Sequence, residues 1–357
     1  CPMLYLSASN DFNAPMDFVE KGMKLIPHDK TRTTYAPHLN HRFTPETEIA
    51  RPLWFDAHLK KRLQFPHTPL AELVLKRENG IPIYRVRPDA SLPIDQVDIY
   101  YGYERDPRNR FWADGQAKEQ AGVWEAECPV FDLDEPLFAF VNVYYRLSEE
   151  QRRKGDPDRF VISAAEMAYP VALRDANVKA SERPRRLVDD FSRGFHDWYT
   201  LNLSNRHHWL FATRKLVDPR WEAPHGAKLS FEIEPSESGN TLAVQLKTDS
   251  WRFYSGKKPD MWTALVHLPK SGRQHVDLAS DAFKNSSGEM LSDWHGLTEL
   301  IFQSGAKAQP SKIDELKHWR GKVPAFSNLH WTGGEPLTRQ KPFLPMDSSS
   351  TESHATD

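Results

Sequence analysis

The chain has 357 residues, of which 39% are hydrophobic and 27% are charged, so it is long enough for two or three domains with their own cores. Its formal net charge of -2 gives no indication of a nucleic-acid or polyanion partner. No apolar run approaches the roughly 18 residues that span a membrane. Two cysteines, Cys1 and Cys128, are too few for a disulfide framework, and no metal-ligand or cofactor spacing occurs.

The first sixty residues alternate predicted strands and helices. Met3–Leu6 is a short apolar run without alternation, which is typical of a parallel strand covered on both faces. A helix is predicted from Pro15, because proline fits the first turn of a helix. Residues 32–36 form the next predicted strand, and a second helix is predicted from Thr44. The apolar residues at helical spacing in the first helix are Phe18, Val19, Met23 and Ile26. This β-α-β-α order indicates a parallel sheet.

The pattern changes after Leu63, where a proline-rich link precedes a region of alternating strands. Residues 70–178 are predicted to form an immunoglobulin- or fibronectin-like β-sandwich, and residues 187–333 a jelly-roll-like β-sandwich. Residues 338–357 contain few apolar groups and are expected to be disordered. The predicted fold is therefore multidomain, with a parallel-sheet segment at 1–63 followed by two sandwiches.

Asp11 and His41 each follow one of the first two predicted strands. The carboxyl ends of parallel strands meet at the same edge of a sheet, so we expect these two side chains to lie close together. An imidazole that is oriented by a carboxylate can remove the proton of a serine or cysteine and so activate it as a nucleophile. The order acid then histidine therefore predicts two members of a hydrolytic triad.

Several pieces of residues 1–60 resemble the C-terminal end of α/β-hydrolases of the dienelactone hydrolase or acetyl xylan esterase kind. The pieces are Pro2-x-Leu4-x-Leu6, Asn10-Asp11, Pro37-x-x-Asn40-His41, and a closing helix with Trp54-Phe55-Asp56-x-His58-Leu59. The resemblance implies a carboxylic-ester hydrolase in which Asp11 is the triad acid and His41 the general base. Prolyl-oligopeptidase-like peptidases share the same catalytic end, so ester and peptide substrates both stay open.

The nucleophile motif of this family, Gly-x-Ser-x-Gly, does not occur in residues 1–357. On the resemblance, the serine is expected upstream of residue 1, and this chain alone is expected to be an inactive fragment. Sandwich domains appended to a polymer-degrading hydrolase favour a secreted or periplasmic protein. The expected substrate is a small-molecule or polysaccharide ester.

Each candidate residue has an alternative interpretation. Asp11 could be a turn or helix-capping aspartate, because Asn-Asp clusters favour turns. Asp17 is a fallback acid, although it falls inside the predicted helix. His38 could be mistaken for the base, but His41 is the residue that matches the hydrolase turn.

A second hypothesis is a non-catalytic carbohydrate-binding or surface protein with a degenerate hydrolase remnant. Aromatic side chains are frequent in the second predicted sandwich, and exposed rings can stack on sugars. They are Trp209, Trp221, Trp251, Tyr254, Trp262, Trp294 and Trp319, and the cluster Trp251-Arg252-Phe253-Tyr254 lies beside Lys257 and Lys258. Aromatic residues on alternating strand positions are, however, more often part of a core.

Overall fold

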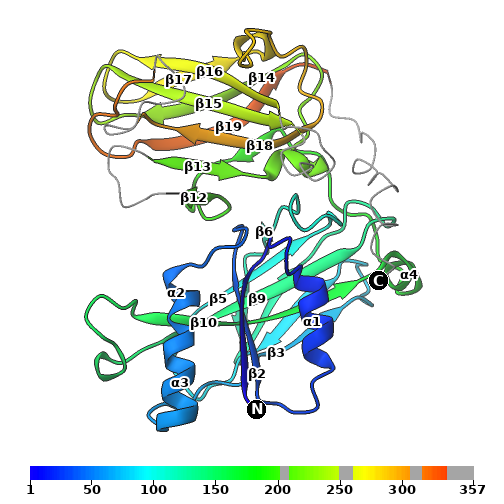
Figure 1. The fold of residues 1–357 in the computed structure, drawn as a ribbon. Coiled ribbons are helices and arrows are strands. Elements are labelled where there is room, and N and C mark those ends of the chain that lie inside the picture. The colour runs from blue at the N-terminus through cyan, green and yellow to red at the C-terminus, as the bar shows by residue number, and fades with distance from the viewer. Residues whose placement is uncertain (202–208, 249–259, 306–315, 336–357) are drawn as a thin grey trace, which may run out of the picture. The chain divides into compact units, whose positions relative to one another are not determined.

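The computed structural model describes residues 1–201, 209–248, 260–305 and 316–335. The chain divides into two compact units, Cys1–Glu182 (unit 1) and Arg183–Asp357 (unit 2), and strands predominate in both (Figure 1). No helix in the described ranges is long and apolar enough to cross a membrane. The tail expected to be disordered, 338–357, lies outside the described residues.

Unit 1 begins with a parallel strand pair. Strand β1 (Met3–Ala8) pairs with β2 (Thr31–Ala36), and helix α1 (Met16–Lys24) connects them. Helices α2 (Pro45–Glu48) and α3 (Ala50–Lys60) follow β2, so the predicted helix from Thr44 is divided in two. Pro52 explains the division, because it lacks the N–H that an uninterrupted helix would donate to residue 48.

The rest of unit 1 is mainly antiparallel. Its strands are β3 (Leu70–Val74), β4 (Ile83–Arg87), β5 (Ile94–Gly102), β6 (Ala113–Asp114), β7 (Lys118–Gln120), β8 (Val123–Glu127), β9 (Leu137–Arg146) and β10 (Arg159–Ala168), and helix α4 (Pro170–Asp175) follows β10. One sheet has the strand order β1-β2-β10-β9-β5-β6, and the other has the order β3-β4-β8-β7.

The boundary expected between residues 63 and 70 does not separate two units. Strand β10 pairs with β2 through Ser163 and Thr33, so the parallel pair extends the sheet of the following region. A shared core then forms, in which Met16 and Tyr35 pack with Tyr100. The physical reason is that a two-stranded parallel pair cannot bury its own faces, whereas a six-stranded sheet can.

Helices α1 and α3 lie on either side of the β1–β2 pair (Figure 1). From α1, Met16 and Val19 pack into the shared core. Phe18, which was expected on the apolar stripe, is 67% exposed, while Glu20 is buried. The face of α1 that carries Glu20 is turned inward, and Glu20 Oε1 accepts a hydrogen bond from the hydroxyl of Tyr35 at 2.7 Å.

Unit 2 is a β-sandwich. Its strands are β11 (Leu187–Asp189), β12 (Tyr199–Leu201), β13 (Leu210–Thr213), β14 (Ala227–Glu234), β15 (Asn240–Thr248), β16 (Asp260–Leu268), β17 (Gln274–Leu278), β18 (Leu297–Gln303) and β19 (Ala325–Gly333). They form antiparallel sheets with the orders β11-β19-β14-β17 and β12-β13-β18-β15-β16. Phe302 of one sheet stacks on Phe326 of the other with ring centroids 4.7 Å apart, so the two sheets face each other across the core.

Candidate functional site

The two residues predicted from the order of strands meet just beyond the carboxyl ends of β1 and β2. His41 Nδ1 lies 3.1 Å from Asp11 Oδ2. The contact follows from the parallel register, which ends with Ala8 opposite Ala36 and so brings both following loops to one edge of the sheet. The structure therefore places the predicted acid and the predicted base within hydrogen-bond distance of each other.

The Asp11 carboxylate is buried and divides its two oxygens between two tasks. Its side chain is 7% exposed. Oδ1 accepts hydrogen bonds from the backbone N–H groups of Asn13, at 2.9 Å, and Ala14, at 3.4 Å, which shape the turn into α1. Oδ2 contacts the imidazole. The sequence left open whether Asp11 shapes a turn or contacts a histidine. In the structure, Asp11 does both.

His41 presents its ring to solvent, with a side chain that is 69% exposed. A carboxylate at Nδ1 favours the tautomer that carries the proton on Nδ1 and leaves Nε2 as the acceptor. Within the described ranges, no residue forms a hydrogen bond to Nε2. The backbone of His41 has a φ of 51°, a left-handed conformation that non-glycine residues rarely adopt. An oriented imidazole with an accessible Nε2 is able to take a proton from a hydroxyl group.

The other histidine of this segment has a different environment. His38 is 4% exposed, and its ring centroid lies 5.7 Å from that of Tyr100 and 5.9 Å from that of Phe111. These contacts are those of a packed core side chain. Asp17, the fallback acid, lies in the first turn of α1. Neither residue takes part in the contact between Asp11 and His41.

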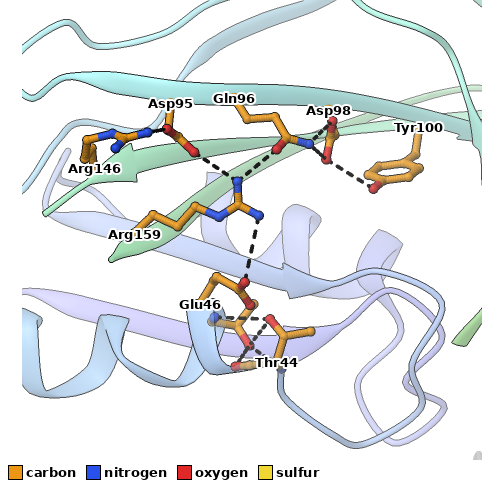
Figure 2. A network of polar contacts seen from close by, with 9 residues as sticks. Thr44, Glu46, Asp95, Gln96, Asp98, Tyr100, Arg146 and Arg159 are labelled. Carbon is orange, nitrogen blue, oxygen red and sulfur yellow. Dashed lines mark hydrogen bonds and ion pairs between the residues drawn. The ribbon is translucent and has the colours of Figure 1, made fainter. Parts of the chain in front are cut away.

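The loop that carries His41, residues 37–44 (the base loop), is anchored where α2 begins. Thr44 Oγ1 caps α2 by accepting from the N–H of Thr47 at 3.4 Å. Glu46, in the same turn, faces Arg159 of β10, and Arg159 also faces Asp95 of β5 (Figure 2). The N–O distance is 3.9 Å from Arg159 to Glu46 and 3.0 Å from Arg159 to Asp95. Strands β5 and β10, from the region expected to be a separate sandwich, therefore contact the start of the helix that follows His41.

The described residues do not place a nucleophile at His41. No serine or cysteine in these ranges is hydrogen-bonded to its ring. Ser9 precedes Asp11 by two positions, but its hydroxyl accepts from the N–H of His38 at 2.8 Å and donates to Asn10 at 3.0 Å. Cys1 precedes β1, at the opposite end of that strand from Asp11. Among the residues that the structure describes, the Asp11–His41 pair thus has no serine or cysteine hydrogen-bonded to its imidazole.

A cavity of about 700 Å³ lies elsewhere in unit 1, beside α1 and the start of β2. Its lining includes Glu20, Lys24 and Arg32, but neither Asp11 nor His41. Burial raises the pKa of Glu20 to about 7, although the hydrogen bond from Tyr35 opposes this shift. Among the described residues, no group of three or more His, Cys, Asp or Glu side chains is placed to hold a metal ion.

The tryptophans of unit 2 are mostly core residues. Those that lie below a tenth of full exposure are Trp198, Trp209, Trp221, Trp294, Trp319 and Trp331. Their rings pack on one another, as when Trp209 meets Trp319 with centroids 5.0 Å apart. Trp251, Tyr254 and their neighbours in the expected sugar-binding cluster lie outside the described residues. Of the described tryptophans of unit 2, only Trp262 is partly exposed.

No family model matches the chain, and no curated protein matches it. Among solved structures, one similar chain is the family 11 carbohydrate-binding module from Clostridium thermocellum, solved in complex with a β-1,3-1,4-mixed-linked tetrasaccharide. It is 13% identical to this chain, and the alignment covers 42% of this chain and 95% of that one, with a TM-score of 0.28. A likeness of this degree does not identify a family for this protein.

Proposed function

We propose that Asp11 and His41 are the acid and the general base of a serine hydrolase that acts on carboxylic esters. The observation that carries the proposal is the contact between Asp11 Oδ2 and His41 Nδ1 at 3.1 Å, made by a buried carboxylate and a solvent-exposed ring. The acid contacts the nitrogen that leaves Nε2 available, as a hydrolytic base requires.

In this reaction His41 Nε2 takes the proton of a serine hydroxyl as the serine attacks the ester carbonyl. The imidazolium that forms is stabilised by Asp11, and its proton then passes to the leaving alcohol, which leaves an acyl-enzyme. Water, activated by the same base, releases the acid product. We propose that sequence preceding residue 1 contributes the serine, so that residues 1–357 alone are inactive.

The surroundings of β1 support a continuation of the sheet. Within the described ranges, β1 is the outermost strand of its sheet, and one edge is available to a further strand. Residues 1–63 also expose several large apolar side chains. They are Met3, Phe18, Leu25, Phe43, Phe55 and Leu59. A parallel strand added beside β1 would end at the same edge as Asp11 and His41, where a nucleophile is needed.

The test is ester hydrolysis by a protein that includes the sequence preceding residue 1, measured with an activated acetyl ester. Replacing the base, in His41→Ala, is expected to lower kcat by about 10²- to 10⁴-fold, the usual contribution of a general base. The matched control is His67→Ala, which removes another exposed histidine of unit 1. Undiminished turnover in His41→Ala would show that His41 is not the base.

A peptide substrate is the variant of the same proposal, because the same pair serves prolyl-oligopeptidase-like peptidases. The pair itself does not distinguish an ester from an amide. Assaying the same protein on a matched ester and peptide decides between the two.

Carbohydrate binding by unit 2 is the weaker proposal. Its support is the β-sandwich architecture, which offers broad sheet faces. Because the described tryptophans are mostly buried, Trp251, Tyr254 or the partly exposed Trp262 would have to supply the stacking contact.

A further inference from the structure

The residue before the acid is held by a loop from a distant part of the sequence. Asn10 is fully buried, and its Nδ2 donates to the carbonyl oxygens of Pro107 and Arg110, both at 2.7 Å. These carbonyls belong to residues 103–112, which connect β5 to β6 (the β5–β6 loop). One amide group thus uses both of its N–H donors on this loop.

The β5–β6 loop is itself held in shape from within. The Arg110 side chain is 1% exposed, and its guanidinium donates to the carbonyl oxygens of Glu104, at 2.6 Å, and Arg105, at 3.2 Å. It also lies over the ring of Phe138 on β9, 3.4 Å from the ring centroid. The loop whose carbonyl groups accept hydrogen bonds from Asn10 is therefore packed against β9 through Arg110.

The same amide connects the acid to the base loop. Asn10 Oδ1 accepts from the Ser9 hydroxyl, and this hydroxyl accepts from the N–H of His38. The N–H of Asn10 donates to the carbonyl of Leu39 at 3.0 Å. Asn10 therefore contacts the β5–β6 loop on one side and is linked to the base loop on the other, while Asp11 is its neighbour in the chain.

We propose that Asn10 is a positioning residue that sets the distance between Asp11 and His41, and that the β5–β6 loop is part of the framework of this site. The inference rests on the proposed function, because the pair that Asn10 positions is the proposed acid and base. Only an amide can donate to two carbonyls while accepting from a hydroxyl. Without it, the carbonyls of Pro107 and Arg110 lose this donor, and the segment that carries Asp11 loses its attachment to the β5–β6 loop.

The charged sequence of the β5–β6 loop fits this structural role. Asp106 pairs with Arg108, at 2.6 Å, and Arg105 pairs with Glu135, at 2.9 Å. These pairs fix the outer part of the loop and leave its inner carbonyls to Asn10.

The test reads the imidazole of His41 directly, in residues 1–357 labelled with ¹⁵N-histidine. Long-range ¹H–¹⁵N spectra at a pH of about 8.5, two units above the pKa of free histidine, report the tautomer of each neutral ring. His41→Gln assigns the resonance, and Asp11→Ala gives the value without the acid. The unmodified protein is expected to show the Nδ1–H tautomer. In Asn10→Ala, the ratio of Nδ1–H to Nε2–H is expected to fall about tenfold, which corresponds to about 1.4 kcal/mol.

The matched control is Asn142→Ala on β9. Asn142 is also fully buried, and its Nδ2 donates to the carbonyl of Tyr35 at 3.0 Å, within strand β2 rather than in either loop. This variant is expected to lower the unfolding temperature without changing the tautomer of His41. A folded Asn10→Ala with an unchanged tautomer ratio would overturn the proposal, and so would an equal shift in Asn142→Ala.

A second variant keeps the test decisive if Asn10→Ala does not fold. Ser9→Ala removes only the hydroxyl between Asn10 and His38, and a smaller shift in the same direction is expected, whereas an unchanged ratio would contradict the proposal. Ester hydrolysis is measured separately, in the protein that includes the sequence preceding residue 1. If that protein positions its imidazole through Asn10 but hydrolyses no ester, the proposed function alone is overturned.

Discussion

Two acid-containing pairs, one in each unit, show how similar burial can serve different ends. In unit 1, the side chain of Asp11 is 7% exposed and that of its partner His41 is 69% exposed. In unit 2, Asp218 and Arg220 are 3% and 2% exposed and lie 2.6 Å apart. Both aspartates are buried, and the difference lies in whether the partner reaches solvent.

In unit 2, the contacts of Asp218 and Arg220 stabilise the local fold. Asp218 Oδ1 accepts from the N–H of Arg220 at 3.0 Å and from its Nε at 2.8 Å, and so caps a short 3₁₀ turn, Pro219–Trp221. The guanidinium also lies over the ring of Trp221. Asp11, in contrast, gives one oxygen to a turn and the other to an exposed ring. The asymmetry of exposure, rather than the burial of the acid, marks the pair that is available for chemistry.

The largest expected effect comes from breaking the doubly buried pair. Arg220→Met leaves the Asp218 carboxylate buried without its cation, which is expected to lower the free energy of unfolding of unit 2 by about 3–5 kcal/mol. Urea unfolding followed by tryptophan fluorescence measures this change. Adding Asp218→Leu to Arg220→Met should recover much of the loss, because an apolar pair of similar volume carries no desolvation cost. A loss below about 1 kcal/mol in the single variant would contradict the structural role of this pair.

An intermediate, pH-dependent effect is expected at Glu20, a buried acid hydrogen-bonded to a neutral hydroxyl. Burial raises its pKa from 4.5 to about 7. The native state therefore holds a proton that the unfolded chain releases, so the stability from this group is complete below pH 4.5 and is lost as the pH rises to about 7. Glu20→Gln should then be more stable than the unmodified protein at pH 8 by about 1–3 kcal/mol.

The measurement for Glu20 is the difference in urea unfolding free energy between variant and unmodified protein, at pH 4 and at pH 8. Burial also raises the pKa of Glu104 to about 7, so the stability of both proteins falls over the same pH range. Subtracting the unfolding free energy of one protein from that of the other removes this shared pH dependence. An equal difference at the two pH values would show that folding does not raise the pKa of Glu20.

The sequence was sufficient to place Asp11 and His41 together, and it was insufficient to show what holds them. The pair could be predicted because its signals are local: two strands, a helix between them, and a polar residue after each strand. The pairing of β10 with β2 joins Ser163 to Thr33, and no local pattern specifies which open edge a strand will meet.

The hydrogen bonds of Asn10 to the β5–β6 loop could not be predicted from the sequence either, because its partners are also distant in the chain. Its side chain was visible as part of the Asn10-Asp11 motif, but its partners are the backbone carbonyls of Pro107 and Arg110. A carbonyl group is present in every residue and leaves no signal of residue type. The tryptophans of unit 2 show the opposite case, since their residue type suggested a surface for sugars, whereas most of the described ones are buried, and they lie mainly in the segments between strands.

The smallest expected effect, and the sharpest contrast with Arg220, is the stability cost of removing His41. In His41→Asn, the free energy of unfolding is expected to stay within about 0.5 kcal/mol of the unmodified protein, because an exposed partner contributes little to stability. Asparagine is chosen because it tolerates the left-handed backbone found at position 41. Urea unfolding at pH 7 measures the change. A loss of about 2 kcal/mol or more would group His41 with the doubly buried residues and remove the distinction on which the proposed function rests.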